Sequence, residues 1–152
     1  MNDRTINSAH GMHMVNDCLI VPVTGNFDDA YTLQLQRDLL KNVKIFCTKK
    51  VLIDVSSIRI LDAFTFSIFK DTAQMILMLG AEVVFVGFQA GVASALVDLD
   101  IEFGDIRTAV TIQDGFELFQ SKTSVFMVTD EIEEITATSS NADLDENERI
   151  DT

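Results

Sequence analysis

The chain has 152 residues, of which 47% are apolar, and this length suits one domain whose core folds without disulfide bonds or a metal ion. Its formal net charge at pH 7 is −13. This excess of acid argues against nucleic acid and anionic membranes as partners, because both attract Lys and Arg, and those residues total only 11.

The amino-terminal residues predict a cytoplasmic protein whose fold begins with a β-hairpin. They lack the charged and then apolar pattern of a signal peptide, and no apolar run approaches the roughly 20 residues of a membrane span. The run Cys18–Val23 is rich in β-branched residues, and Met12–Val15 precedes it closely enough to pair with it. His10 and His13 have no acidic partner at ligand spacing, so we expect surface residues and no metal site.

The next two elements are a helix and a buried strand. Asp28 and Asp29 stand where helix caps are favoured, and apolar residues then recur at helical spacing, which predicts a helix over Asp29–Lys44. The adjacent carboxylates of this pair are therefore interpreted as cap and dipole partners, and not as a catalytic acid and base. Val51–Val55 is apolar on both faces, which is typical of a strand in a parallel sheet covered by helices.

A second long helix follows a short loop, Ser56–Leu61. Asp62 is suited to its amino-terminal cap, and the pattern predicts a helix over Ala63–Leu79 that Gly80 ends at the position after its carboxyl-terminal cap. Most of the circumference of this helix is apolar. We therefore expect one side to face the sheet and another to face a partner.

The remaining elements complete an alternating α/β pattern. Glu82–Val86 and Ile106–Val110 are of strand type, and Gly91–Leu99 reads as a short helix between them. Thr111 and Asp114 resemble a capping box that opens a last helix. The order β-β-α-β-α-β-α-β-α predicts a mixed, mostly parallel five-stranded sheet flanked by four helices.

The carboxyl-terminal residues differ in composition from the rest of the chain. Val128–Thr152 holds nine carboxylates and one base, Arg149, which gives a balance of −8. Low hydrophobicity and like charge are typical of a disordered segment. We predict a domain over residues 1–127 and an acidic, disordered tail over residues 128–152.

The sequence holds no common catalytic or cofactor-binding signature. It lacks a glycine-rich phosphate loop and a zinc-protease motif, so we expect no enzyme, no catalytic residue and no cofactor. Cys18 and Cys47 lie in apolar surroundings without a CxxC spacing, and both are interpreted as structural thiols.

The start of the second long helix is the most informative segment. A buried strand leads there to an aspartate and small hydroxyl residues at a helix amino terminus, where backbone N–H groups are unsatisfied and the dipole is positive. A phosphate in the first turn would be stabilised there, while its charge of nearly −2 would disfavour an acidic partner on the same surface. The position is well suited to a phosphorylation switch.

These residues resemble the STAS domains of bacterial anti-sigma-factor antagonists, in particular the RsbS type of stressosome scaffold. The resemblance covers roughly Asp17 to Gln120. It implies a STAS fold and a scaffold that oligomerises with itself and with a sensor-bearing STAS paralogue, and that sequesters a switch serine/threonine kinase until phosphorylation releases it. The stretches that carry the resemblance are NDCLIVPV, DDAYTLQLQRDLLK, VLIDVSSIRILDAFTFSIFKD and MLGAEVVFVGFQ.

The resemblance also implies where the switch lies. The family has a phosphorylated serine directly after the aspartate that corresponds to Asp62, and this chain has Ala63 there, so the phosphoacceptor hydroxyl is missing. The chain is then either a variant blocked on purpose or a natural relative locked in the kinase-sequestering state. Nearby hydroxyls at Thr65, Ser56 and Ser57 are alternative acceptors. The implied kinase-docking and switch loop consists of Ser56, Ser57, Asp62, Ala63, Phe64 and Thr65.

The resemblance also bears on a second phosphorylation position and on a sensor domain, and two alternative functions stay open. Ala95 stands where the sensor-bearing paralogues have a second phosphorylated threonine, and the short segment before the fold leads us to expect no sensor domain. A monomeric anti-anti-sigma factor that binds an anti-sigma kinase directly is one alternative function. A small-ligand-binding α/β domain is another.

Overall fold

A computed structural model describes residues 4–5, 10–24 and 28–121. The chain divides into two compact units, Met1–Leu118 and Phe119–Thr152, and the description below concerns the first. The predicted acidic tail over residues 128–152 lies outside the described residues, so the predicted domain boundary stays a prediction. No helix in the described ranges is long and apolar enough to cross a membrane.

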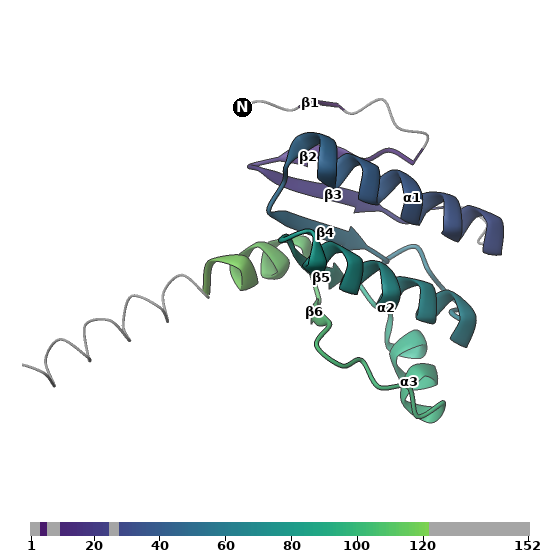
Figure 1. Ribbon diagram of the computed structural model, residues 1–152. Coiled ribbons are helices and arrows are strands. Elements are labelled where there is room, and N and C mark those ends of the chain that lie inside the picture. Colours follow the sequence, from purple (N-terminus) through teal and green to yellow (C-terminus); the bar gives the residue numbers. More distant parts are fainter. Residues whose placement is uncertain (1–3, 6–9, 25–27, 122–152) are drawn as a thin grey trace, which may run out of the picture. The chain divides into compact units, whose positions relative to one another are not determined.

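One mixed sheet runs through the domain in chain order (Figure 1). The first three strands pair antiparallel and the last four pair parallel, which confirms the predicted mixed, mostly parallel α/β fold. The two-residue β1 adds an edge strand that the sequence pattern did not predict. The strands are β1 (Arg4–Thr5), β2 (His13–Val15), β3 (Cys18–Pro22), β4 (Lys50–Asp54), β5 (Glu82–Val86) and β6 (Arg107–Ala109).

The β2–β3 hairpin has a tight two-residue turn. Asn16 and Asp17 both have positive φ, 48° and 61°, as a type I′ turn requires. Asn and Asp tolerate this left-handed backbone better than other non-glycine residues. The turn therefore fixes the register in which His13 pairs with Ile20.

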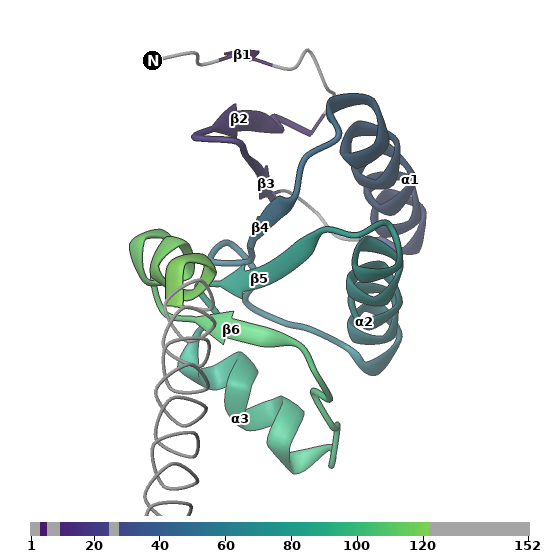
Figure 2. The same ribbon diagram turned by 60° about the vertical axis from the view of Figure 1, so that its left-hand side comes forward.

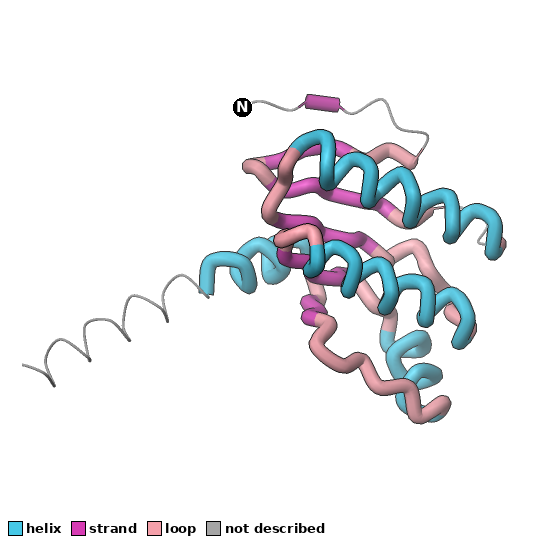
Figure 3. The backbone as a smooth tube through the Cα atoms, in the orientation of Figure 1, coloured by secondary structure: helices cyan, strands magenta, loops and turns pink. Residues whose placement is uncertain are grey.

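Helices alternate with the parallel strands, as Figure 3 shows in cyan and magenta. The first two, α1 (Asp29–Phe46) and α2 (Ala63–Met78), lie side by side on one face of the sheet (Figures 1 and 2). After β5 comes the shorter α3 (Ala90–Asp98), and a fourth helix covers residues 112–121. The four predicted helices are thus present.

The caps expected at the start of α1 and after the end of α2 both form. Asp28 accepts a hydrogen bond from the Tyr31 N–H at 2.7 Å, which begins α1. After α2, Gly80 has a φ of +81° and its N–H donates to Leu77 O, while the Ala81 N–H donates to Ile76 O. This pair of bonds is a Schellman motif, which explains why a glycine ends the helix.

The central strands are buried on both faces. Val51 and Ile53 of β4 belong to the core under α1 and α2, while Leu52 points to the opposite face and is also buried. A Cβ placed on Gly115 would lie 2.9 Å from both Leu52 Cδ1 and Val86 Cγ1. The fourth helix therefore packs its backbone against this second face, and the close approach requires a glycine.

One expectation about a single side chain was wrong, and the two cysteines differ in exposure. His10 is buried, not on the surface: its Nε2 lies 3.1 Å from Asp38 Oδ2, and its ring meets Tyr31 edge-on with the centroids 5.0 Å apart. Cys47, at the carboxyl-terminal cap of α1 with a φ of 49°, is exposed, and Cys18 is buried. Their interpretation as structural thiols stays a prediction.

Candidate switch surface

The predicted switch loop emerges where three parallel strands end. Its base continues the hydrogen bonding of the sheet, because the Val55 N–H donates to Val86 O at 2.9 Å and the Val23 N–H donates to Asp54 O at 2.9 Å. The carboxyl ends of parallel strands are where α/β folds commonly bind their partners. The loop thus starts from a rigid base at that end of the sheet.

Alternating burial holds the rest of the loop in place. Val55, Ile58 and Leu61 are buried in the core, while the residues between them are exposed. The Ile58 N–H donates to Val55 O at 3.0 Å, and the Ser56 N–H donates to Asp54 Oδ1 at 2.9 Å. Buried side chains and local hydrogen bonds together keep the exposed positions in one arrangement.

Asp62 begins α2 as the sequence predicted. Its Oδ1 accepts a hydrogen bond from the Thr65 N–H at 2.7 Å, and its carbonyl oxygen accepts one from the Phe66 N–H at 3.0 Å. Hydrogen bonds from the Thr65 backbone, and next from the Thr65 side chain, hold the pKa of the Asp62 carboxyl below its usual value. The carboxylate is therefore charged at neutral pH and occupies the helix amino terminus.

Ala63 is the first residue of α2 and is exposed. At this position the helix has backbone N–H groups that no intrahelical acceptor satisfies. A side chain at residue 63 is thus open to a partner and adjacent to a region that favours negative charge. The structure places residue 63 where the sequence predicted, although its role in phosphorylation stays a prediction.

The other hydroxyl groups near the helix start differ in accessibility. Thr65 is buried and bonded to Asp62, so its hydroxyl is not presented to solvent. Ser56 and Ser57 are exposed in the loop, on the same end of the sheet as Asp62. The structure therefore favours the two serines over Thr65 as alternative acceptors.

Three residues of this surface were not singled out from the sequence. Ile60 is 87% exposed, which is unusual for an isoleucine in a loop whose neighbouring apolar residues are buried. Gln89 Nε2 donates to Ser56 O at 2.9 Å and ties the start of α3 to the loop. Gly87 has a φ of +84°, and a Cβ on it would lie 2.8 Å from Ser56 Cβ. The strand–glycine–phenylalanine pattern after β5 was a signal that could have pointed to such a close approach.

The described residues offer little for small-ligand or metal chemistry. A hollow of about 210 Å³ lies beside β6, and no charged residue lines it. Its lining is Phe88, Ala93, Phe103, Thr108, Ala109 and Val110. Within the part of the chain that the structure describes, no three His, Cys, Asp or Glu side chains are grouped to hold a metal ion.

The family is decided by the sequence profile of the STAS domain, which matches residues 12–115, more than half of the chain. The chain belongs to the STAS domain family. Among curated proteins, this STAS chain is similar to the RsbT co-antagonist protein RsbRA of Bacillus subtilis (strain 168), with 22% identity over 110 residues. The match covers 72% of this chain and 40% of RsbRA, so the chain spans less than half the length of that relative.

Solved structures share the STAS fold. A serine-to-glutamate variant of RsbS from Moorella thermoacetica superposes with a TM-score of 0.68 at 22% identity, over 77% of this chain and 99% of that one. A chain from a structure of the stressosome, described as a signal integration and transduction hub, gives 0.64 at 22% identity, over 74% and 97%. The expected STAS fold is confirmed.

Proposed function

We propose that this chain is a cytoplasmic stressosome scaffold of the RsbS type, a binding module and not an enzyme. It assembles with copies of itself and with sensor-bearing STAS paralogues, and it holds a switch serine/threonine kinase through the loop and helix start from Ser56 to Thr65. Membership of the STAS family and similarity to RsbRA and RsbS support this proposal. The observation that carries it is the switch loop, whose exposed residues are held in place by buried neighbours and which ends at the Asp62 cap.

The surface has the composition of a protein-docking site. Ile60 is 87% exposed and Phe64 is 49% exposed, and they flank the charged Asp62 cap. Exposed apolar anchors beside a charged group are what a protein partner buries at the centre of an interface. A small polar substrate would gain nothing from these two side chains.

The switch acts through charge at residue 63. A phosphate there would add nearly two negative charges beside free backbone N–H groups, which stabilise it, and beside Asp62, whose carboxylate adds to the repulsion of an acidic partner. Because Ala63 has no hydroxyl, the chain keeps the unmodified surface and holds the kinase. We therefore describe it as locked in the sequestering state.

Restoring the hydroxyl tests the switch directly. The Ala63→Ser variant and the unaltered chain are incubated with ATP and a switch serine/threonine kinase from the same organism, and phosphate is mapped by mass spectrometry. We expect phosphate on residue 63 of the variant and none on the unaltered chain. Phosphate on Ser56, Ser57 or Thr65 of the unaltered chain would show that the switch is not blocked.

Kinase docking is tested by truncating the two apolar anchors. We expect Ile60→Ala and Phe64→Ala each to weaken kinase binding by about tenfold, because central apolar contacts contribute on the order of 1 kcal/mol or more. Both side chains are largely exposed, so the unfolding temperature should change little. Met78→Ala is the matched control, since Met78 is 86% exposed at the other end of α2. Equal loss in all three variants would contradict docking at this surface.

A further inference from the structure

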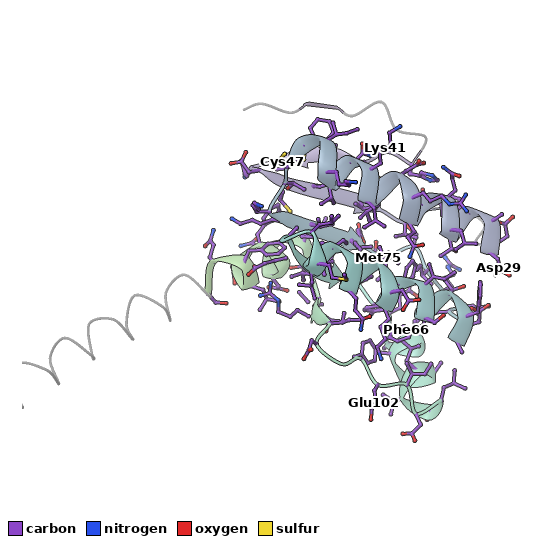
Figure 4. The ribbon with its side chains drawn as sticks, in the orientation of Figure 1. Asp29, Lys41, Cys47, Phe66, Met75 and Glu102 are labelled. Carbon is purple, nitrogen blue, oxygen red and sulfur yellow. The ribbon has the colours of Figure 1, made fainter. Side chains whose placement is uncertain are left out.

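A basic and apolar surface lies at the end of the long helices farthest from Asp62. We call it the amino-end patch, because it borders the amino ends of the parallel strands. Lys49 Nζ lies 3.8 Å from the Cβ position of Gly80, which places this lysine at the carboxyl-terminal end of α2. Figure 4 labels Lys41 on α1, Cys47 just after its carboxyl-terminal end, and Met75 on the neighbouring helix α2. The exposed residues of the patch are Lys41, Lys44, Lys49, Met75, Met78 and Leu79.

The positive charge of this patch is not neutralised within the described domain. Residues 39–53 contain four lysines and no acid, in a chain whose net charge is −13. The ion pairs among the described residues are His10 with Asp38 and Arg107 with Glu82, and neither includes a patch lysine. The negative end of the α1 dipole accounts for Lys44 in its last turn, but not for Lys49 or for the exposed methionines.

A surface of opposite character follows α3. We call it the acidic loop: its carboxylates are Asp98, Asp100, Glu102 and Asp105, all exposed, with no Lys or Arg between them. Val97 and Leu99 beside them are 71% and 56% exposed. Lys70 approaches this loop, but its Nζ donates to the backbone oxygen of Glu102 at 3.4 Å. Its hydrogen bond thus goes to the backbone and not to a carboxylate of the loop.

The two surfaces lie apart on one molecule. The acidic loop packs near the start of α2, since the rings of Phe103 and Phe66 are 5.1 Å apart between centroids. The amino-end patch is at the other end of that helix, and the helical rise from Lys70 to Met78 alone is about 12 Å. Figure 4 shows Cys47 toward the upper left of the domain and Glu102 near its bottom. Each surface is therefore open to a second molecule.

We propose that the amino-end patch of one copy binds the acidic loop of the next copy. The two surfaces have opposite charge, and each carries exposed apolar side chains that the contact would bury. The contact joins different surfaces of the two molecules, so each copy keeps one unpaired surface after a single contact, and association can continue into a ring or an open chain. The proposal rests on the scaffold function and names the self-association surfaces that such a scaffold needs.

Charge reversal tests the contact. One variant carries Lys41→Glu, Lys44→Glu and Lys49→Glu, and a second carries Asp98→Lys, Glu102→Lys and Asp105→Lys. Asp100 is left unchanged because its positive φ of 54° would strain a lysine. Sedimentation equilibrium of the full chain should show self-association that weakens at least tenfold in each variant, and association should return in an equimolar mixture of the two. The control reverses Arg59 to Glu and Asp71 to Lys, which lie outside both surfaces, and should associate normally.

Salt supplies a second measurement. Raising the salt from about 0.1 M to about 0.5 M shortens the screening length and should weaken the association of the unaltered chain. Circular dichroism of each variant checks that it is folded. A monomeric unaltered chain, a mixture that does not associate, association that strengthens with salt, or an equal loss in the control would each overturn the proposal.

Kinase binding separates this proposal from the scaffold function on which it rests. The lysine-reversed variant keeps the switch surface at the opposite end of α2, so its kinase affinity should equal that of the unaltered chain. Normal kinase binding by a chain that never self-associates would overturn the contact between copies and leave the kinase-docking function standing. Loss of kinase binding by the folded, unaltered chain would overturn the proposed function itself.

Discussion

The side chain of Asp62 combines two tasks, because it caps α2 and supplies the negative charge of the switch surface. Its carboxylate accepts the Thr65 N–H at 2.7 Å, and its pKa is held below the usual value. A carboxyl group with a lowered pKa in the folded state stabilises the fold above the unfolded pKa, and the contribution is lost as the pH falls through the folded pKa.

Replacing Asp62 should therefore lower the stability of the fold by an amount that depends on pH. We expect Asp62→Ala to lower the free energy of unfolding at pH 7 by about 1 kcal/mol, as is usual for helix amino-terminal caps. The stability difference between the unaltered chain and Asp62→Asn should shrink as the pH falls below about 4. Urea denaturation between pH 7 and pH 3 measures both effects, with Asp71→Asn, exposed on the same helix, as control. A stability difference between the unaltered chain and Asp62→Asn that grows as the pH falls would contradict the role of the carboxylate charge.

The two cysteines should differ sharply in reactivity. Burial raises the pKa of the Cys18 thiol to about 12, although the nearby Lys50 and a hydrogen bond with the Leu52 backbone oppose the shift, while Cys47 is exposed. Because the thiolate is the reactive form, a chromogenic disulfide reagent should titrate one thiol in the folded chain and two in denaturant. Cys47→Ser should abolish the folded-state reaction. Two reactive thiols in the folded chain would contradict the burial of Cys18.

Single residues could be predicted from the sequence where their role is local. The caps at Asp28 and Asp62 depend on an acidic residue directly before a helical run, and the reciprocal Thr111–Asp114 bonds depend on a three-residue spacing, so the local sequence predicted them. His10 could not be placed, because its burial depends on Asp38 and Tyr31 of another element. Ile60 looked like an ordinary loop residue, since only the burial of its neighbours shows that it must point outward.

At the scale of elements, Gly87 joins the β5–α3 connection to the switch loop. A Cβ there would lie 2.8 Å from Ser56 Cβ and 3.1 Å from Ser56 Cα, in a backbone conformation with positive φ. Both effects disfavour any other residue. The switch loop and the start of α3 therefore share one tight contact in addition to the Gln89 hydrogen bond.

Substituting this glycine should disturb both segments. We expect Gly87→Ala to destabilise the fold by about 1–3 kcal/mol and to weaken kinase binding through the displaced Ser56. Gly91→Ala is the matched control, because a Cβ there meets nothing within 4 Å and alanine favours the helix, so its stability should rise slightly. Urea denaturation measures both variants. Unchanged stability in Gly87→Ala would show that the loop is not held by this contact.

The helices and strands were largely predictable, because a segment with strong apolar periodicity is stable only where a neighbouring layer buries its apolar face. The two long helices and the central strands carry patterns that only an α/β sandwich buries, and the structure confirms them. β1 was missed because Arg4 and Thr5 show no apolar alternation, and their pairing depends on the β2 edge. The amino-end patch was not predicted, since its members come from α1, the segment before β4 and the end of α2.

At the scale of the whole molecule, the sequence predicts that the domain ends near Met127. A chain truncated after this residue should keep the unfolding temperature of the full chain, because it retains the helix over residues 112–121 that covers Leu52 and Val86. A chain truncated before Thr111 loses that cover and should be strongly destabilised. Calorimetry of the two truncated chains measures the difference. A large loss on removing residues 128–152 alone would contradict the predicted boundary.

Burial of Ile58 and Leu61 holds the switch loop in one arrangement, and this also affects how fast a partner binds and dissociates. A loop that is already ordered loses little conformational entropy on association, so complex formation needs no slow folding step. In the Ala63→Ser variant, phosphorylation of residue 63 would then act by adding charge to a surface whose shape stays fixed. In that variant, we expect removal of the phosphate to restore binding without any refolding of the domain.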